Sequence, residues 1–430
     1  MLHVMPHLLY VSATDTSATH ASISAALRHA NAGDTVLVGP GRYSPTHTSE
    51  AFPLYVPLGV TLLGSGQDQS IIDGEGAMEL SFRPVRAGES LVLLGDGSSL
   101  SGFTLINSGG NGIGNQPGAR IQIMRNTIGQ HGQHGIILSG PEEAIIKDNL
   151  LQDNGTKQFR PITPRPAAGR QGHHIFVQGK IGAANRILIS DNTMTRAFAD
   201  GLAVVVFFDE GDGVHMHVRV FHNTIEHSER RGLTIAGSFG PSHNRVAIDV
   251  RHNLIRDNAA LGIGAQAARP LVTQLLRDNH LVLHLLDNEC LNNGEGIMLY
   301  GGFGPAEDNR LDATIMGNHI TGACRYGLRI IGGVGMGGYA VRRNCVRAVI
   351  SRNRIENVAQ MPIMLQGGAA EGQEESIGNT VLAQVLENEL STMAGTPPLL
   401  LNDGLPDNAV HVEEPIPSHE RRHQVLPYEA

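Results

Sequence analysis

A recurring phrase of about 30 to 35 residues constrains the fold of this chain more than any other feature of its sequence. The phrase is clearest at 221–237, 251–266 and 317–333, where an Asn is followed two residues later by an apolar residue and nine residues later by Gly. A repeat of this length is typical of a solenoid, in which each unit buries its inner face only against its neighbours. The marker asparagines are Asn126, Asn149, Asn192, Asn223, Asn253, Asn288, Asn318, Asn353 and Asn388.

Apolar residues alternate with polar ones before each Asn and after each Gly, as Ile248 and Val250 do before Asn253. A period of two indicates short strands with one inward face. Each unit therefore holds three short strands, and stacked units lie about 4.8 Å apart, the spacing of neighbouring strands. Asn tolerates turn dihedrals and can hydrogen-bond to the next coil, so the repeated Asn predicts a column of structural amides.

On these residues the sequence resembles right-handed parallel β-helix proteins of the pectate-lyase-like superfamily, over roughly residues 35–395. The stretches "AGDTVLVGPGRYSP" (32–45) and "FPLYVPLGVTLLGSGQDQSIIDGEG" (52–76) resemble the opening of a widespread β-helix domain of uncharacterised function. The resemblance implies an all-β fold: a single-stranded right-handed parallel β-helix of about ten coils.

The segment "THASISAALRHANAGD" (19–34) has apolar residues at helical spacing, which predicts a helix that caps the N-terminal end of the core. We expect an N-terminal strand and this capping helix in residues 1–34, the β-helix in 35–401, and a polar, extended or partly disordered tail in 402–430.

Composition excludes several classes of partner. The net charge is −9 and no basic tract occurs, so nucleic acid and anionic membranes are poor partners. The cysteines Cys290, Cys324 and Cys345 are odd in number and form no CxxC pair, which argues against a disulfide framework or a zinc knuckle. We expect no cofactor. The N-terminus does not read as a signal peptide and no 18-residue apolar run occurs, so we expect a cytoplasmic protein, or a secreted one if the sequence is trimmed.

In the resembled fold, the strand after the Gly lines the usual substrate groove. Its outward residues include Tyr300 and Arg329 on adjacent coils. A Tyr beside a cation can donate a proton or, with a lowered pKa, act as a base. These two are candidate catalytic residues, and the remaining outward positions include the candidate substrate contacts Phe176, Gln178, Gln266, Met298 and Gln366.

Polar residues stand just before the recurring Gly, at the rim of this face. His173, Asp200 and Arg231 fall on successive coils and form a candidate acid–base row, although polar residues before Gly are also ordinary turn residues. The same rim position carries His134, Glu295 and Tyr326 in other coils.

Two irregular regions flank the same face. The longest insertion, at 154–172, carries Arg165 and Arg170 and reads as either a binding lid or a neutral surface loop. The opposite turns carry Phe207, Phe208, Phe239, Phe303 and Met336, of which Phe239 and Phe303 repeat an FGP motif. They predict an apolar pocket or a surface that stacks on sugar rings, unless they only pack within their own loops.

No metal site is expected. His215 and His217 alternate on one strand and both face outward, but no third ligand is evident and Arg219 beside them disfavours a cation.

Three functions remain open from the sequence. The first is a carbohydrate-active enzyme (a lyase, epimerase or hydrolase) with acid–base chemistry and no redox cofactor, whose partner is a glycan. The second is an intracellular isomerase, cyclase or dehydratase that acts on a smaller, more apolar metabolite. The third is a non-catalytic binding or scaffold protein. The first rests on fold analogy, because neither a cluster of three aspartates nor a DPH motif occurs. The substrate and oligomeric state stay open.

Overall fold

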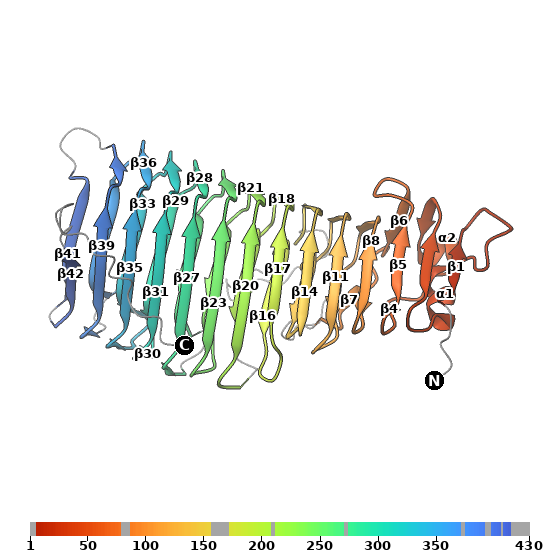
Figure 1. Cartoon of the computed structure of the whole chain (residues 1–430), viewed down its shortest axis with the longest axis horizontal. Helices are drawn as coiled ribbons and strands as arrows, with labels where there is room; N and C mark the ends of the chain where they lie inside the picture. The colour runs from red at the N-terminus through yellow and green to blue at the C-terminus, as the bar shows by residue number, and fades with distance from the viewer. Residues whose placement is uncertain are drawn as a thin grey trace.

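A computed structural model of the chain describes residues 6–78, 87–155, 172–207, 211–270, 274–370, 375–391, 397–405 and 407–413. Its strands wind in successive coils around one elongated core, from the red N-terminal end to the blue C-terminal end of Figure 1. Each coil contributes one strand to each of three long parallel sheets, so the predicted right-handed parallel β-helix is confirmed.

Sheet 1 has fourteen strands and holds the residues that precede the marker Asn. Its strands are β1 (Leu8–Val11), β2 (Thr35–Val38), β5 (Thr61–Gly64), β8 (Ser98–Ser101), β11 (Arg120–Met124), β14 (Glu143–Lys147), β17 (Arg186–Ser190), β20 (His215–Phe221), β23 (Arg245–Arg251), β27 (His280–Leu286), β31 (Arg310–Met316), β35 (Cys345–Ser351), β39 (Thr380–Leu386) and β42 (Ala409–Glu413).

Sheet 2 has twelve short strands that follow the marker position. They are β3 (Gly41–Tyr43), β6 (Ser70–Asp73), β9 (Thr104–Ile106), β12 (Thr127–Gly129), β15 (Leu150–Gln152), β18 (Thr193–Thr195), β21 (Thr224–Glu226), β24 (Leu254–Arg256), β28 (Glu289–Leu291), β32 (His319–Thr321), β36 (Arg354–Glu356) and β40 (Glu389–Leu390).

Sheet 3 has twelve strands and holds the residues after the recurring Gly. They are β4 (Leu54–Val56), β7 (Ser90–Leu94), β10 (Asn111–Asn115), β13 (Ile136–Ser139), β16 (Ile175–Gly179), β19 (Leu202–Val206), β22 (Arg231–Ala236), β25 (Leu261–Gln266), β29 (Glu295–Phe303), β33 (Tyr326–Gly335), β37 (Met361–Ala370) and β41 (Leu399–Gly404). A fourth sheet joins β26 (Leu276–Arg277), β30 (Ala306–Glu307), β34 (Val341–Arg342) and β38 (Ser376–Ile377).

The core consists of aliphatic side chains stacked one per coil. In sheet 2, Ile225, Ile255, Cys290, Ile320 and Ile355 follow one another in register, and all are buried. Since each side chain contacts the equivalent residue of the next coil, burial grows with every added coil and no single coil is stable alone.

The predicted asparagine column is present. From Asn126 to Asn353, the backbone N–H of each marker Asn donates to Oδ1 of the next one, at 2.9–3.1 Å. The expectation that the Asn itself adopts the turn conformation is wrong, however. The residue before each Asn takes the left-handed conformation, as His252 does at φ 54°. The Asn itself supplies only hydrogen bonds.

The structure contains a second asparagine column that the repeat pattern did not predict. Asn244, Asn279, Asn309, Asn344 and Asn379 stack at the turn from sheet 3 to sheet 1, with N–H to Oδ1 distances of 2.9–3.2 Å. Asn408 extends it by accepting from the N–H of Asn379 at 2.9 Å. Two turns of the C-terminal coils are therefore held by amide columns.

The N-terminal end is closed as predicted by α1 (Ile23–His29), with Ser22 as its N-cap and Ile23, Ala26 and Leu27 buried in the core. Glu50 is buried and accepts from the N–H groups of Ile23 and Ser24 at 2.7 and 2.8 Å, which satisfies the free donors of the first turn. A short helix, α2 (Pro45–Thr48), follows β3.

The expected limits of the β-helix need correction. β1 pairs in register with β2, so residues 8–11 belong to sheet 1. At the other end β41 pairs with β37 and β42 with β39, so regular strands continue past residue 401 into the expected tail. Sheets of twelve strands also exceed the expected ten coils, because the first coils lack the marker Asn from which the coils were counted.

We expect Asn253→Ala to lower the free energy of unfolding by about 2–4 kcal/mol, because it leaves a buried N–H and a buried carbonyl on neighbouring coils without hydrogen-bond partners. Asn253 accepts from the N–H of Asn223 at 2.9 Å and donates to the carbonyl of Val220 at 2.8 Å. The measurement is the midpoint of urea denaturation. Asn31→Ala is the control, since that side chain is exposed. Equal shifts for the two variants would contradict a structural role for the column.

Candidate functional site

The outer face of sheet 3 carries the candidate residues in two rows that run along the helix axis. The strand register aligns every predicted outward position, so the facing assignment is correct. The first row is Ile137, Phe176, Ala203, Thr234, Gly264, Met298, Arg329 and Met364, and the second is Ser139, Gln178, Val205, Ala236, Gln266, Tyr300, Ile331 and Gln366.

This outer face differs from that of sheet 1 in its exposure. Ala203, Val205 and Ile331 are each 1% exposed, although they point away from the core, whereas His215 and Arg219 of sheet 1 are exposed. Charged groups on the sheet 3 face therefore lie in surroundings of low dielectric, where their interactions are stronger than in water.

The predicted row of His173, Asp200 and Arg231 is formed by a chain of hydrogen bonds at the rim. The backbone N–H of His173 donates to Nδ1 of His134, that of Asp200 to Nδ1 of His173, and that of Arg231 to Oδ1 of Asp200, each at 3.2 Å. Because Nδ1 accepts in both rings, each neutral imidazole carries its proton on Nε2.

Burial holds the pKa of His134 well below its ordinary value and also lowers that of His173, although Asp200 opposes the second shift. His173 Nδ1 lies 3.6 Å from Asp200 Oδ2, but a neutral ring that accepts through Nδ1 forms no ion pair there. Asp200 also accepts from the Thr234 hydroxyl at 2.9 Å. Both carboxylate oxygens of Asp200 are therefore engaged.

Next to this row, five rings form what we call the aromatic half of the face: His134, His173, Phe176, Phe207 and Phe239. His134 stacks on Phe176 with centroids 4.8 Å apart, and on His173 at 5.1 Å. Phe207 meets Phe176 and Phe239 edge-on at 6.2 and 6.1 Å. The candidate contacts Phe176 and Phe239 thus belong to one continuous aromatic strip.

The coils after it carry what we call the cationic half: Arg231, Arg269, Glu295, Tyr300 and Arg329. Here the predicted pair of Tyr300 and Arg329 is brought together with Arg231. The Nη1 atom of Arg231 lies 3.6 Å from the position that a Cβ of residue 264 would occupy. The Arg231 guanidinium therefore lies over Gly264, at ordinary van der Waals distance.

The pKa of Tyr300 is raised, because burial outweighs the opposing effect of Arg329, Arg231 and Arg269. The expectation that Tyr300 could be a base through a lowered pKa is thus wrong, and its phenol keeps its proton. The ring packs edge-on against the candidate contact Phe303 at 5.5 Å, and the hydroxyl contacts the sulfur of Met298.

Glu295 was not singled out by the sequence among the rim residues. It accepts at Oε1 from Arg325 Nη1 at 3.2 Å, and its Oε2 has no partner among the described residues. Burial raises the pKa of this carboxyl above its ordinary value, against the effect of Arg329 and Arg325. Glu295 begins β29 and is only 6% exposed, but an acid directly before the recurring Gly looks in the sequence like an ordinary turn residue.

Arg269 was also missed, since it lies in a turn outside the repeating pattern. Its guanidinium lies 4.9 Å from the centre of the Phe303 ring. Burial, and then the nearby Arg231 and Arg230, lower the pKa of Arg269 to about 10. Arg329 stacks over Tyr326 at 5.0 Å, and its buried Nε has no described partner.

Other predicted residues lie apart or outside the described part. Gln366 is on β37, beyond Arg329, and donates to the carbonyl of Gly368 at 3.2 Å. Met336 is 39% exposed and does not join the aromatic half. Arg165, Arg170 and Phe208 lie outside the described residues, as does most of the 154–172 insertion.

No group of three His, Cys, Asp or Glu side chains within the described ranges is placed to hold a metal ion. His217 instead approaches Asp249 at 3.6 Å. In the same part of the chain, no helix has the length and apolar character needed to cross a membrane.

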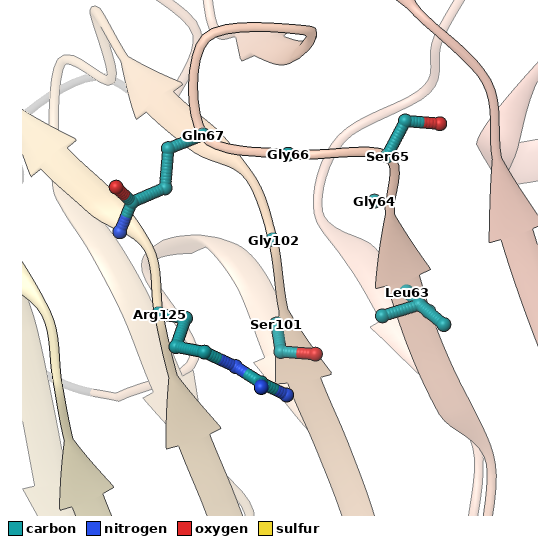
Figure 2. Close-up of a pocket in the computed structure, with 8 residues that line it drawn as sticks. All are labelled: Leu63, Gly64, Ser65, Gly66, Gln67, Ser101, Gly102 and Arg125. Atoms are coloured by element: carbon teal, nitrogen blue, oxygen red, sulfur yellow. The ribbon is translucent and has the colours of Figure 1, made fainter.

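A depression of about 330 Å³ lies elsewhere, at the turns from sheet 1 to sheet 2 near the N-terminal coils (Figure 2). Two of its turns approach each other closely: a Cβ at Gly64 would lie 2.2 Å from the carbonyl oxygen of Gly102. Arg125 is its one charged lining residue, so it offers no acid–base pair. It is lined by Leu63, Gly64, Ser65, Gly66, Gln67, Ser101, Gly102 and Arg125.

Comparison with known proteins gives a fold and no activity. A family model described as a protein of unknown function (DUF1565) matches residues 12–161, and one described as a right-handed β-helix region matches residues 90–269. A search of curated proteins found no match.

Two solved structures have a similar fold. Polygalacturonase from Erwinia carotovora ssp. carotovora is 10% identical with a TM-score of 0.51, over 96% of this chain and 98% of that one. The catalytic unit of the thermostable GH87 α-1,3-glucanase from Streptomyces thermodiastaticus strain HF3-3 is 13% identical with a TM-score of 0.51, over 83% and 65%. At such identities the likeness concerns the fold alone. With its three parallel sheets and these matches, the chain is a right-handed parallel β-helix protein whose N-terminal part is similar to a family of unknown function.

Proposed function

We propose that this protein is a carbohydrate-active enzyme that performs acid–base chemistry on the outer face of sheet 3. The observation that carries the proposal is that Glu295 and Tyr300 lie on one strand, β29, and both are within electrostatic reach of Arg231 and Arg329. One is a carboxylate with a free oxygen, and the other is a phenol that keeps its proton. The folds of a polygalacturonase and an α-1,3-glucanase support the substrate class by analogy.

In this proposal, Glu295 is the general base, because its Oε2 has no described partner and its raised pKa makes the carboxylate more basic. Tyr300 is the proton donor. Arg231 and Arg329 stabilise negative charge that develops on the substrate. Asp200 is a positioning residue, since its two oxygens hold the backbone of Arg231 and the hydroxyl of Thr234.

This arrangement favours proton abstraction, as in a lyase or epimerase, over hydrolysis. Glycoside hydrolysis generally uses two carboxyl groups that both face the substrate. On this face both oxygens of Asp200 already accept hydrogen bonds, whereas Glu295 has an oxygen without a partner among the described residues.

A second candidate is an isomerase, cyclase or dehydratase that acts on a small apolar metabolite. The aromatic half and the buried aliphatic floor at Val205 and Ile331 favour it. A polymer requires a binding face that spans several coils, whereas a small metabolite would contact one or two of them.

We expect Glu295→Gln and Tyr300→Phe each to lower kcat/KM on the polysaccharide that the protein turns over by about 10²–10⁴-fold, the usual contribution of one general acid or base. Turnover is measured on a panel of neutral and acidic polysaccharides by the appearance of reducing ends, unsaturated products or inverted sugar units.

The matched controls are Glu289→Gln, on the same coil but in sheet 2, and Tyr339→Phe, whose ring is 38% exposed in a turn. Both should retain activity. If Glu295→Gln and Glu289→Gln had the same activity, Glu295 would not be the base, and turnover of no polysaccharide by the wild type would remove the carbohydrate proposal.

The pH dependence follows from the same two groups. Glu295 must be ionised, and its pKa is raised above the ordinary 4.5, so kcat/KM should rise with pH through a midpoint above that value. Tyr300 must keep its proton, and its pKa is raised above 10.0, so activity should persist up to at least about pH 10. A pH–rate profile measures both limbs. An acid midpoint below 4.5, or a loss of activity well below pH 10, would contradict these roles.

A further inference from the structure

The cationic half holds more positive charge than its neighbours neutralise. Arg231, Arg269 and Arg329 form no ion pair with any described residue. Glu295 is paired with Arg325, and both Asp200 oxygens already accept hydrogen bonds. The whole chain carries a net charge of −9, so this concentration of guanidinium groups is contrary to its overall charge.

Such crowding is unfavourable without an anion. Burial and the neighbouring Arg231 and Arg230 lower the pKa of Arg269 to about 10, and burial lowers the pKa of Arg231. A bound anion would offset both effects, because a guanidinium in a site of low dielectric gains most from an opposite charge in contact with it.

An independent observation points to a polar ligand at the same place. Gln266 is 2% exposed, and its Nε2 has no partner among the described residues. It lies in register with Tyr300 on the adjacent coil and two residues after Gly264, over which the Arg231 guanidinium folds. A buried amide donor without an acceptor destabilises the site, so a ligand acceptor here is favoured.

We propose that the cationic half is a subsite for a carboxylate group on the sugar substrate, bound by Arg231, Arg269 and the Gln266 amide. The inference rests on the proposed function and names its substrate class: an acidic oligosaccharide. Guanidinium groups match the planar, two-oxygen geometry of a carboxylate, which favours this anion.

The two halves also set the direction of binding. From Phe176 on β16 to Gly264 on β25 there are three strand spacings, or about 14 Å, which exceeds the length of one sugar ring. A sugar ring that stacks on Phe176 and the unit whose carboxylate is bound are therefore different units of one chain. The oligosaccharide lies along the helix axis with its acidic unit toward the C-terminal coils.

The test is calorimetric binding to the full-length protein carrying Tyr300→Phe, which limits turnover. The probes are trigalacturonate, trimannuronate, their methyl esters, which keep the shape but lack the charge, and a sulfated galactose trisaccharide. We expect at least one uronate trimer to bind about tenfold or more tightly than its ester, with an affinity that falls as salt rises.

Adding Arg269→Gln should remove this preference, whereas Arg347→Gln, an exposed arginine of sheet 1, should leave it unchanged. Melting temperatures of the variants check that they fold, and Arg269→Lys should retain part of the preference. Esters that bind as tightly as the acids, binding only to the sulfated trimer, or a preference unaffected by Arg269→Gln would each overturn the inference.

The two proposals can fail separately. Turnover of a neutral polysaccharide without binding of any uronate would overturn the acidic subsite and leave the carbohydrate-active enzyme standing. If no acidic or neutral oligosaccharide bound or reacted, both would be overturned.

Discussion

The structure depends on one interaction: the hydrogen bond from a buried turn N–H to the side-chain amide of the next coil. A coil that turns a corner leaves backbone donors facing neighbouring coils, where water cannot reach them. At the marker turn, Asn supplies the acceptor through Oδ1, while its Nδ2 donates to a carbonyl of the preceding coil, as Asn253 does to Val220. The column thereby fixes the register of each coil against the next.

The candidate site uses a related device, in which the acceptor side chain belongs to the preceding coil. At the turn into sheet 3, Asn111 accepts from the N–H of His134, and then His134, His173 and Asp200 take over the accepting role in successive coils. The row ends at Arg231, because a guanidinium has no acceptor atom. Its side chain is instead free to fold over Gly264. The hydrogen bonds that hold these turns in register are therefore made by the same side chains that form the candidate acid–base row.

This continuity explains how much the sequence could predict. Period and alternation identified the fold, the nine asparagines and the outward rows, because backbone geometry repeats with the coil. They placed Tyr300 and Arg329 on adjacent strands of one outer face, since both follow the pattern. Glu295 looked like any turn acid, and Arg269 lies in an irregular turn, so neither had a periodic signal. The raised pKa of Tyr300 depends on burial by parts of the chain distant in sequence, which a local pattern does not contain.

The polar groups of the site are held by the regularity around them. Glu295, Gln266 and Arg329 each bury an atom without a described partner, an arrangement that costs free energy of folding. The aliphatic cores of the surrounding coils, and the hydrogen bonds that satisfy the N–H groups of their turns, offset this cost. Register matters most here, because a shift of one residue in β29 would turn Tyr300 inward and Leu299 outward. The strictness of the repeat is therefore a condition for the site, and the asparagine column that enforces it acts on function as well as stability.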